Sequence, residues 1–271
     1  REHPNNSGEL WAGTDDGLVW KTSDDGKTWS SIKNFTELPK TKVGSLSLPL
    51  VYVQDIVLSS HQKDLVYAVF NNHKNGDFKP YVLVSKDKGK SWKSISSNLP
   101  VRGTAYDIAE DHVDPNLLFV GTEFGVFFSY DGGEEWKQIK AGLPTIAVKD
   151  IEIQERENDL VLATFVRSFY VLDDYSVLRS VDNSDKELAV KIFDVRDALM
   201  WEKANPLGLP GKAFQGDNFY LAENLDPVAI FTYNYNEKFE SLKSKRQEAE
   251  KKLIKDEKDV SYPTYNELFN E

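Results

Sequence analysis

The 271-residue sequence contains no cysteine, which excludes disulfide bonds and metal sites built from thiolates. It also has no apolar run of the ~18 residues that a membrane-spanning helix needs. Its opening residues, Arg1 to Leu10, lack both an initiator methionine and the apolar stretch of a signal peptide. We therefore expect no membrane span, and we expect the chain to begin inside a longer protein.

Basic residues are in the minority, because 33 Lys and Arg face 44 Asp and Glu and the formal net charge is −11. A polyanion would be repelled at long range, so nucleic acid is not an expected partner. The four histidines show no metal-ligand spacing, and the sequence has neither a phosphate-binding Gly-rich loop nor a nucleophile elbow. We expect no metal and no cofactor.

The most informative feature is an internal repeat. Octapeptides of the pattern Ser/Thr-x-Asp-x-Gly-x-x-Trp occupy residues 22–29, 85–92 and 129–136. The interval from Trp92 to Trp136 has the length of a four-stranded propeller blade, roughly 40–50 residues, and the interval from Trp29 to Trp92 is longer by about 20. This period predicts an all-β fold made of propeller blades.

Strand patterns recur in register with the octapeptides. Leu10–Trp20 matches Leu118–Phe128 as two β-runs joined by a Gly-bearing turn. The first strands of successive blades align at Val53–Leu58, Ala105–Glu110 and Val148–Ile153. Each of these first strands carries one aspartate at the same position.

The repeats delimit a partial propeller with two complete blades, roughly 53–97 and 105–143, and two partial ones at 9–33 and 148–180. A closed propeller needs about 4–8 blades to remove its sheet edges. We therefore expect residues 1–180 to be the C-terminal arc of a larger propeller. The remaining blades would come from sequence outside this chain or from another chain.

Each octapeptide has a mechanical interpretation. Asp and Ser/Thr side chains satisfy turn amides, Gly supplies a positive φ, and Trp plugs the space between sheets. The residues assigned this structural role are Asp24, Gly26, Trp29, Asp87, Gly89, Trp92, Asp131, Gly133 and Trp136.

The octapeptides resemble the bacterial neuraminidase repeat, or Asp-box, and the order of segments resembles the sortilin-type propeller family, especially its large bacterial, glycosyl-hydrolase-like members. Asp77–Val82, Asp114–Gly125 and Arg156–Leu160 carry the closer match, which covers residues 9 to about 180. The resemblance implies an extracytoplasmic protein, whether periplasmic, cell-surface or secreted. The turn Ala163–Arg167 departs from the Gly-Thr-His-Gly-Arg-like turn of those bacterial members, because the histidine is missing.

Beyond the blades the pattern changes. We expect a polar linker at residues 181–188 and then, at 189–271, an incomplete β-sandwich-like unit. Its elements are predicted as strands at Lys191–Val195, Phe219–Ala222 and Val228–Tyr235 and a charged helix at about 237–258.

Two classes of function remain open. The first is a non-catalytic module that binds a protein, peptide or glycan on a propeller face, where residues that do not repeat can build selectivity. Its candidate ligand-binding residues are His73, Asp77, Phe78, Glu123, Phe124, Phe165 and Arg167.

The second is a glycoside hydrolase acting on an extracellular polysaccharide, which needs two carboxylates about 5–10 Å apart. Asp55, Asp107 and Asp150 recur in one register, and such symmetry favours a structural hydrogen bond over an active site. Glu123 and Glu152 are the acids that do not repeat, so they are the candidate catalytic pair. We favour the binding module, because no catalytic pair is evident from the sequence.

Overall fold

The computed structural model describes residues 1–39, 41–43, 46–48, 51–140, 142–198, 200–202, 227–236 and 241–265. The chain forms two compact units, Arg1–Val181 and Asp182–Glu271. Nearly all regular structure in the first unit is antiparallel β-sheet.

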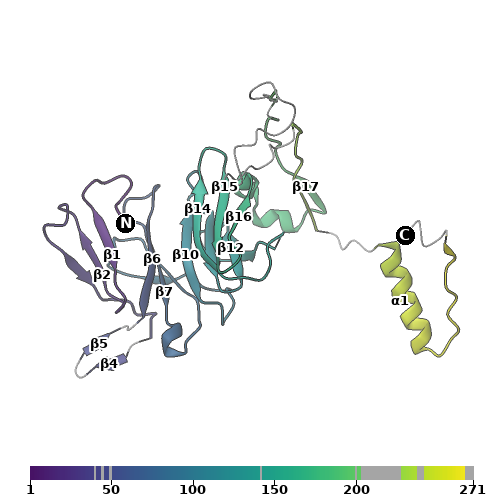
Figure 1. The fold of residues 1–271 in the computed structure, drawn as a ribbon, viewed down its shortest axis with the longest axis horizontal. Helices are drawn as coiled ribbons and strands as arrows, with labels where there is room; N and C mark the ends of the chain where they lie inside the picture. The colour runs from purple at the N-terminus through teal and green to yellow at the C-terminus, as the bar shows by residue number, and fades with distance from the viewer. Residues whose placement is uncertain are drawn as a thin grey trace, which may run out of the picture. The chain divides into compact units, whose positions relative to one another are not determined.

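The described part of the first unit contains four blade sheets that follow one another along the chain, besides one small two-stranded sheet (Figure 1). The first and last have three strands and the middle two have four, which confirms the predicted partial propeller with two complete and two partial blades. The strands, grouped by blade, are β1 (Leu10–Gly13), β2 (Val19–Thr22) and β3 (Ser30–Ile32); β6 (Tyr52–Leu58), β7 (Val66–Asn71), β8 (Tyr81–Ser85) and β9 (Lys93–Ser94); β10 (Ala105–Glu110), β11 (Leu118–Thr122), β12 (Gly125–Ser129) and β13 (Lys137–Gln138); and β14 (Val148–Gln154), β15 (Asp159–Thr164) and β16 (Phe169–Leu172).

Smaller elements connect and follow the blades. The hairpin β4 (Thr41–Val43) and β5 (Leu46–Leu48) lies between the first and second blades, and the 3₁₀ helix η1 (His73–Asn75) lies in the β7–β8 loop. After β16 the chain enters a second 3₁₀ helix, η2 (Tyr175–Ser180). Arg1 to His3 run antiparallel to β1, where a first strand would pair, through bonds such as Trp11 N–H to the Arg1 carbonyl at 2.9 Å.

The hydrophobic core lies in the seams between blades. Trp11 and Phe35 pack with β6–β8 residues in the first seam, Ile95 packs with β10–β12 residues in the second, and Phe119 packs with β14–β15 residues in the third. Strands β7 and β11 are buried along their whole length. This is expected of strands that pack against a neighbouring sheet on both faces, and such strands are mostly apolar. One apolar cluster in each of the three seams therefore holds neighbouring blades together.

The second unit is less regular in its described part. It contains the 3₁₀ helix η3 (Asn183–Lys186), a two-stranded sheet of β17 (Val190–Ile192) and β18 (Tyr233–Tyr235), and the helix α1 (Leu242–Lys255). The predicted strand Phe219–Ala222 lies outside the described residues. Helix α1 begins after Ser241, whose hydroxyl accepts the Ser244 N–H, so it is shorter than the predicted 237–258.

Residues 181–188, expected to be a polar linker, contain η3. Asp182 and Asp185 form a reciprocal capping box there. Asp185 is buried, and Lys191 pairs with it at 2.7 Å. These acids give the segment local order that its polar composition does not indicate.

Candidate functional site

One end of the blades gathers the turns between second and third strands. In the third and fourth blades this turn bonds to the residue that precedes the first strand: Glu123 N–H donates to the Thr104 carbonyl at 3.0 Å, and Phe165 N–H donates to the Ala147 carbonyl at 2.9 Å. The Thr104 hydroxyl also donates to the Phe78 carbonyl at 3.4 Å, which links the second and third blades. We call this end the loop face, formed by residues 72–80, 123–124 and 165–168 with Tyr106 and Lys149.

Tyr106 and Lys149 reach the loop face because a β-bulge precedes the repeated aspartate. The pairing register of the first strand skips one residue between Ala105 and Asp107 in β10 and between Val148 and Asp150 in β14. The same skip falls between Val53 and Asp55 in β6. A bulge leaves one residue unpaired and re-aims its side chain.

The side chains of Tyr106 and Lys149 contact two of the predicted ligand-binding residues, Glu123 and Phe165. The Lys149 Nζ lies 3.2 Å from the centroid of the Tyr106 ring and 5.6 Å from that of the Phe165 ring. The Tyr106 hydroxyl donates to Glu123. A cation over one ring, near a second and beside a carboxylate is held by cation–π attraction and by charge, and its N–H groups can also donate to a ligand.

Burial shifts the pKa values of both Lys149 and Tyr106. Burial lowers the pKa of Lys149, against an opposing effect of Glu123. Burial and then Glu123 raise the pKa of Tyr106. The Tyr106 phenol therefore stays protonated, and a hydrogen-bond donor, across the neutral range.

The turn at 165–168 is exposed and strained. Phe165 is 62% exposed and Arg167 is exposed beside it. Val166 has a φ of 74° and Ser168 a φ of 63°, in the left-handed region that a β-branched residue rarely occupies. Backbone strain of about 1–3 kcal/mol per residue collects at binding turns.

The four remaining candidate ligand-binding residues differ in exposure and in whether their side chains already have hydrogen-bond partners. Phe78 and Phe124 are exposed on the loop face. His73 lies with its Nδ1 2.5 Å from the Asn71 amide oxygen. Asp77 accepts from Tyr81 at 2.6 Å, and although burial raises its pKa, this bond and others lower it overall. His73 and Asp77 are therefore engaged in shaping their own loop.

The two candidate catalytic acids have different partners. Glu123 accepts from Tyr106, whereas Glu152 is exposed on β14. The pKa of Arg1 is raised chiefly by Asp55 and to a smaller extent by Glu152. No hydrogen bond or ion pair joins Glu123 to Glu152 in the described chain.

The repeated aspartates form a graded series. Asp107 is buried and accepts the Ile151 N–H of the next blade at 2.5 Å, Asp55 is half-buried beside Arg1 at 3.3 Å, and Asp150 is exposed. Burial and then Asp55 raise the pKa of Asp107 to about 9. A protonated Asp107 can donate to Asp55, whose Oδ2 is buried with no partner among the described residues. Carboxyls in direct hydrogen-bond contact are closer than the about 5–9.5 Å of a glycosidase pair, which favours a structural role.

Asp107→Asn is expected to flatten the pH dependence of stability. A carboxyl whose pKa is higher in the folded state than in the unfolded state binds its proton more tightly when folded. The contribution of Asp107 to stability is therefore greatest below the unfolded pKa of about 4 and falls as pH rises towards about 9. Urea unfolding of the wild type at several pH values should show this decline and the variant should lack it. Asp150→Asn is the matched control, and a decline as steep in Asp107→Asn as in the control would contradict the shared-proton pair.

At the opposite end of the blades, the octapeptides form turns with a common set of hydrogen bonds. Gly89 N–H donates to the Ser85 hydroxyl at 2.7 Å, and Ser91 N–H and hydroxyl donate to the Asp87 carboxylate at 2.8 and 2.6 Å. The turns around Asp24 and Asp131 repeat this arrangement, with the Gly at positive φ. In the first two turns these bonds lower the pKa of Asp24 and of Asp87 to about 2.

The tryptophans of the octapeptides do not all plug a seam. Trp92 is 7% exposed against Phe35 of the first blade, and Trp136 is 3% exposed with its Nε1 donating to the Ile95 carbonyl of the second blade at 2.6 Å. Trp29 is 42% exposed and bonds only to its own turn, at the Gly26 carbonyl, so the expectation that it plugs the space between sheets is wrong. Trp92 and Trp136 pack against the preceding blade, and the described chain places no blade before that of Trp29.

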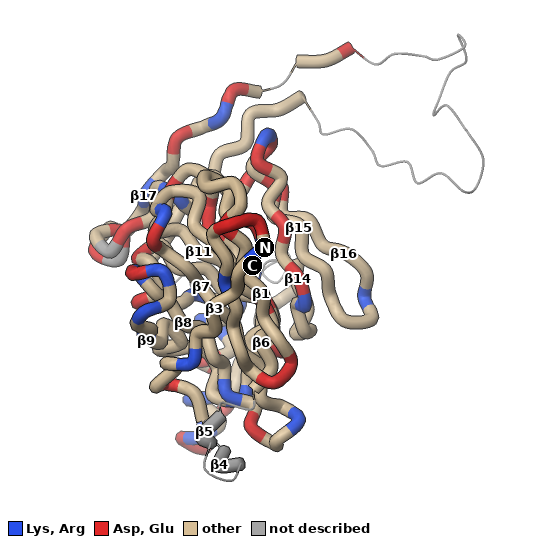
Figure 2. Tube along the Cα trace, turned by 90° about the vertical axis from the view of Figure 1, so that its left-hand side faces the viewer, with Lys and Arg blue, Asp and Glu red and all other residues tan. Residues whose placement is uncertain are grey.

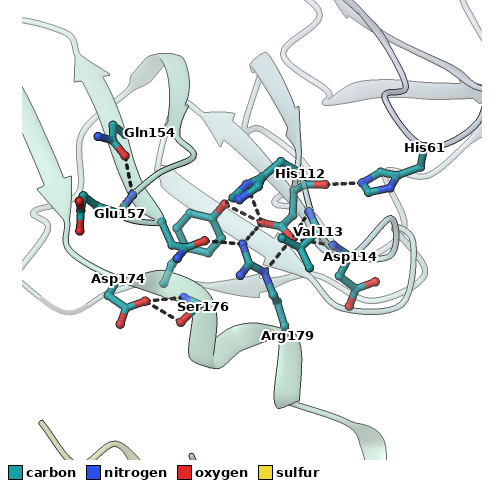
Figure 3. Close-up of polar contacts among 12 residues, drawn as sticks. His61, His112, Val113, Asp114, Gln154, Glu157, Asp174, Ser176 and Arg179 are labelled. Carbon is teal, nitrogen blue, oxygen red and sulfur yellow. Dashed lines mark hydrogen bonds and ion pairs between the residues drawn. The ribbon is translucent and has the colours of Figure 1, made fainter. Parts of the chain in front are cut away.

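A charged cluster that sequence analysis missed lies at the octapeptide end (Figure 3). Asp111, fully buried, accepts from Arg179 Nε and Nη2 at 2.8 Å each and from the Tyr175 hydroxyl at 2.5 Å. Burial raises the pKa of Asp111, but these bonds and two from the following backbone outweigh it and lower the pKa to about 2. The cluster fastens η2 to the third blade.

Charge is spread rather than concentrated in the first unit. In the view of Figure 2, blue Lys and Arg segments and red Asp and Glu segments are interspersed among uncharged residues. Within the described ranges, no group of three or more His, Asp or Glu side chains is arranged to hold a metal ion. No described helix is long and apolar enough to cross a membrane.

Comparison with solved structures identifies the class of fold. A GH74 enzyme from Niastella koreensis matches with a TM-score of 0.50 and 16% identity, over 71% of this chain and 32% of that one. An ancestral GH74 enzyme matches with a TM-score of 0.49 and 17% identity, over 64% and 24% of the two chains. YCF48 bound to D1 peptide matches with a TM-score of 0.43 and 14% identity, over 65% and 54%.

The likeness to the Niastella koreensis enzyme and the four successive sheets define the first unit as part of a β-propeller. The chain spans about a third or less of the length of the two GH74 enzymes. No protein-family model and no curated protein matches the chain.

Proposed function

We propose that the first unit is a non-catalytic, extracytoplasmic binding module that holds a segment of a partner protein or peptide on its loop face. The observation that carries this proposal is the exposed aromatic and cationic surface there, beside the half-buried Lys149, which lies over the ring of the buried Tyr106 and near that of the exposed Phe165. Phe78, Phe124 and Arg167 extend the same surface. Exposed aromatics beside arginine are typical of the residues that contribute most to protein binding.

The chemistry of the loop face favours an extended ligand with an acidic or carbonyl group beside an apolar one. The free N–H groups of Lys149 and the guanidinium of Arg167 donate to carboxylates and carbonyls, and the phenylalanine rings offer apolar contact. The strained turn at 165–168 supports this role, because contacts with a ligand can stabilise a conformation that the sequence disfavours.

We further propose that residues 1–180 are the C-terminal arc of an Asp-box propeller of sortilin type. The common turn bonds around Asp24, Asp87 and Asp131 support this assignment. The remaining blades would come from sequence outside this chain or from a partner chain. An extracytoplasmic location follows from the same assignment.

The binding proposal is tested with a peptide selected by phage display on the full chain. Phe124→Ala and Arg167→Ala should each weaken its binding at least tenfold, about 1.4 kcal/mol, when measured by fluorescence anisotropy. Val113→Ala is the control, because Val113 is exposed but lies in the turn after β10, away from the loop face. Unchanged affinity in both loop-face variants would rule out this face as the binding site.

The alternative is a glycoside hydrolase that uses Glu123 and Glu152. It is supported by the two non-repeated acids beside the inner strands, and a glycan could also stack on the phenylalanine rings of the loop face. Release of reducing ends from a panel of soluble polysaccharides tests it. Hydrolysis that Glu123→Gln and Glu152→Gln each abolish, with the thermal melt unchanged, would establish the enzyme in place of the binding module.

A further inference from the structure

In three blades the outer strand follows a common sequence. Trp29, Trp92 and Trp136 each precede a short strand, and an isoleucine follows three positions later in the pattern Trp-x-x-Ile. The isoleucine N–H bonds the third strand: Ile95 donates to the Val82 carbonyl at 2.9 Å, and Ile139 donates to the Val126 carbonyl at 3.0 Å. Trp92 and Trp136 enter the seam with the preceding blade.

The fourth blade has the edge for such a strand but no strand on it. In the fourth blade Leu172 pairs with Leu160, as Ser129 pairs with Leu118 in the third. Val171 therefore occupies the register position of Phe128, the third-blade residue that pairs with the outer strand β13. In the described chain no strand pairs with the outer edge of β16.

The reason is local to the turn after β16. Asp174, at the position of Asp131, adopts φ 45° and caps η2 instead of continuing a hairpin. Arg179 stands where the repeat would place tryptophan, and its guanidinium is committed to Asp111 at 2.8 Å. The chain therefore leaves the fourth blade before forming an outer strand.

A hollow marks the position of the absent tryptophan. It has a volume of about 160 Å³ and is lined by Ile139 and Leu143 of the third blade and by Leu160, Leu162 and Tyr170 of the fourth. Ile139 is the repeat equivalent of Ile95, against which Trp136 packs in the preceding seam. An apolar cavity of ~150 Å³ can hold a benzene ring.

We propose that the outer edge of β16 and this hollow, together the fourth-blade slot, bind an extended segment of a partner protein with the pattern aromatic-x-x-aliphatic. The segment would add a fourth strand to the blade, place its aromatic ring in the hollow, and bond through its backbone to Phe169 and Val171. This is recognition by strand addition, in which main-chain bonds give affinity and a side-chain pocket gives specificity.

The charge of the chain adds a preference. With a net charge of −11, it attracts a segment with basic residues around the aromatic one. Two of the chain's own outer strands have such a basic residue, because lysine follows the tryptophan in Trp92-Lys93 and Trp136-Lys137. The fourth-blade slot is separate from the loop face, so this proposal does not depend on the proposed function.

The test uses the full chain and a fluorescein-labelled peptide with the sequence of residues 90–97, which contains Trp-Lys-Ser-Ile. Fluorescence anisotropy should show saturable micromolar binding, and a peptide with alanine in place of tryptophan should bind at least tenfold more weakly. Absence of saturable binding, or equal binding of the two peptides, would overturn the proposal.

Two variants of the protein locate the site. Val171→Pro removes an edge N–H that the register directs outwards, and Leu143→Gln makes the hollow polar. Each should weaken the peptide at least tenfold with its thermal melt retained, whereas Val113→Ala should bind like the wild type. Leu143→Gln keeps the test decisive if Val171→Pro fails to fold. Wild-type affinity in a folded variant of the slot would overturn the assignment.

Discussion

Trp136→Ala is expected to lower the free energy of unfolding by about 3–5 kcal/mol. The side chain is 3% exposed, so its removal leaves a large cavity in the seam between the second and third blades. It also leaves the buried Ile95 carbonyl without the indole N–H that it accepts at 2.6 Å. Urea unfolding followed by tryptophan fluorescence measures the loss.

Trp29→Ala is the matched control, because Trp29 ends an octapeptide of the same pattern but is 42% exposed. Its expected effect is within about 0.5 kcal/mol, as for most surface substitutions. Equal losses at Trp29 and Trp136 would show that the turn itself, and not the seam, determines the contribution of the tryptophan.

Asp111→Ala is the second substitution with a large expected effect, a loss of about 3–5 kcal/mol, the range found when one partner of a buried ion pair is removed. It would leave the half-buried Arg179 guanidinium and the Tyr175 hydroxyl without their main acceptor and would free η2 from the third blade. Thermal and urea unfolding measure the loss.

Asp114→Ala is the control for this cluster, because Asp114 lies in the same turn but accepts one backbone bond, from Asn116 at 2.9 Å. The wild type should also lose stability in acid. The pKa of Asp111 is lowered to about 2, so the stabilisation is complete above about pH 4 and is lost as pH falls towards 2. An Asp111→Ala loss no larger than that of Asp114→Ala would contradict this role.

Much of the blade architecture could be predicted from the sequence, because each blade repeats a pattern whose physical cause is local. Alternation of apolar residues, turn glycines and the octapeptides predicted the four successive sheets. The exposure of Trp29 could not be predicted in this way, since an octapeptide does not indicate whether a blade packs against it. Burial of a seam residue depends on the neighbouring blade.

The candidate site was predictable only in part. Glu123 and Phe165 were selected because they break the repeat, and the structure places both beside Lys149. Tyr106 and Lys149 were missed because their side chains are re-aimed by a bulge, which depends on strand register. The only available signal was their position immediately before the repeated aspartates. Asp111 was missed because its partners, Tyr175 and Arg179, lie more than 60 residues along the chain.

Hydrogen exchange of the full chain, with and without the display-selected peptide, tests the binding function most directly. The account predicts that added protection concentrates in residues 72–80, 123–124 and 165–168, and that Arg167→Ala removes this protection at the same peptide concentration. Protection confined to the octapeptide turns, or none on the loop face at saturating peptide, would contradict the claim that the loop face is the binding site.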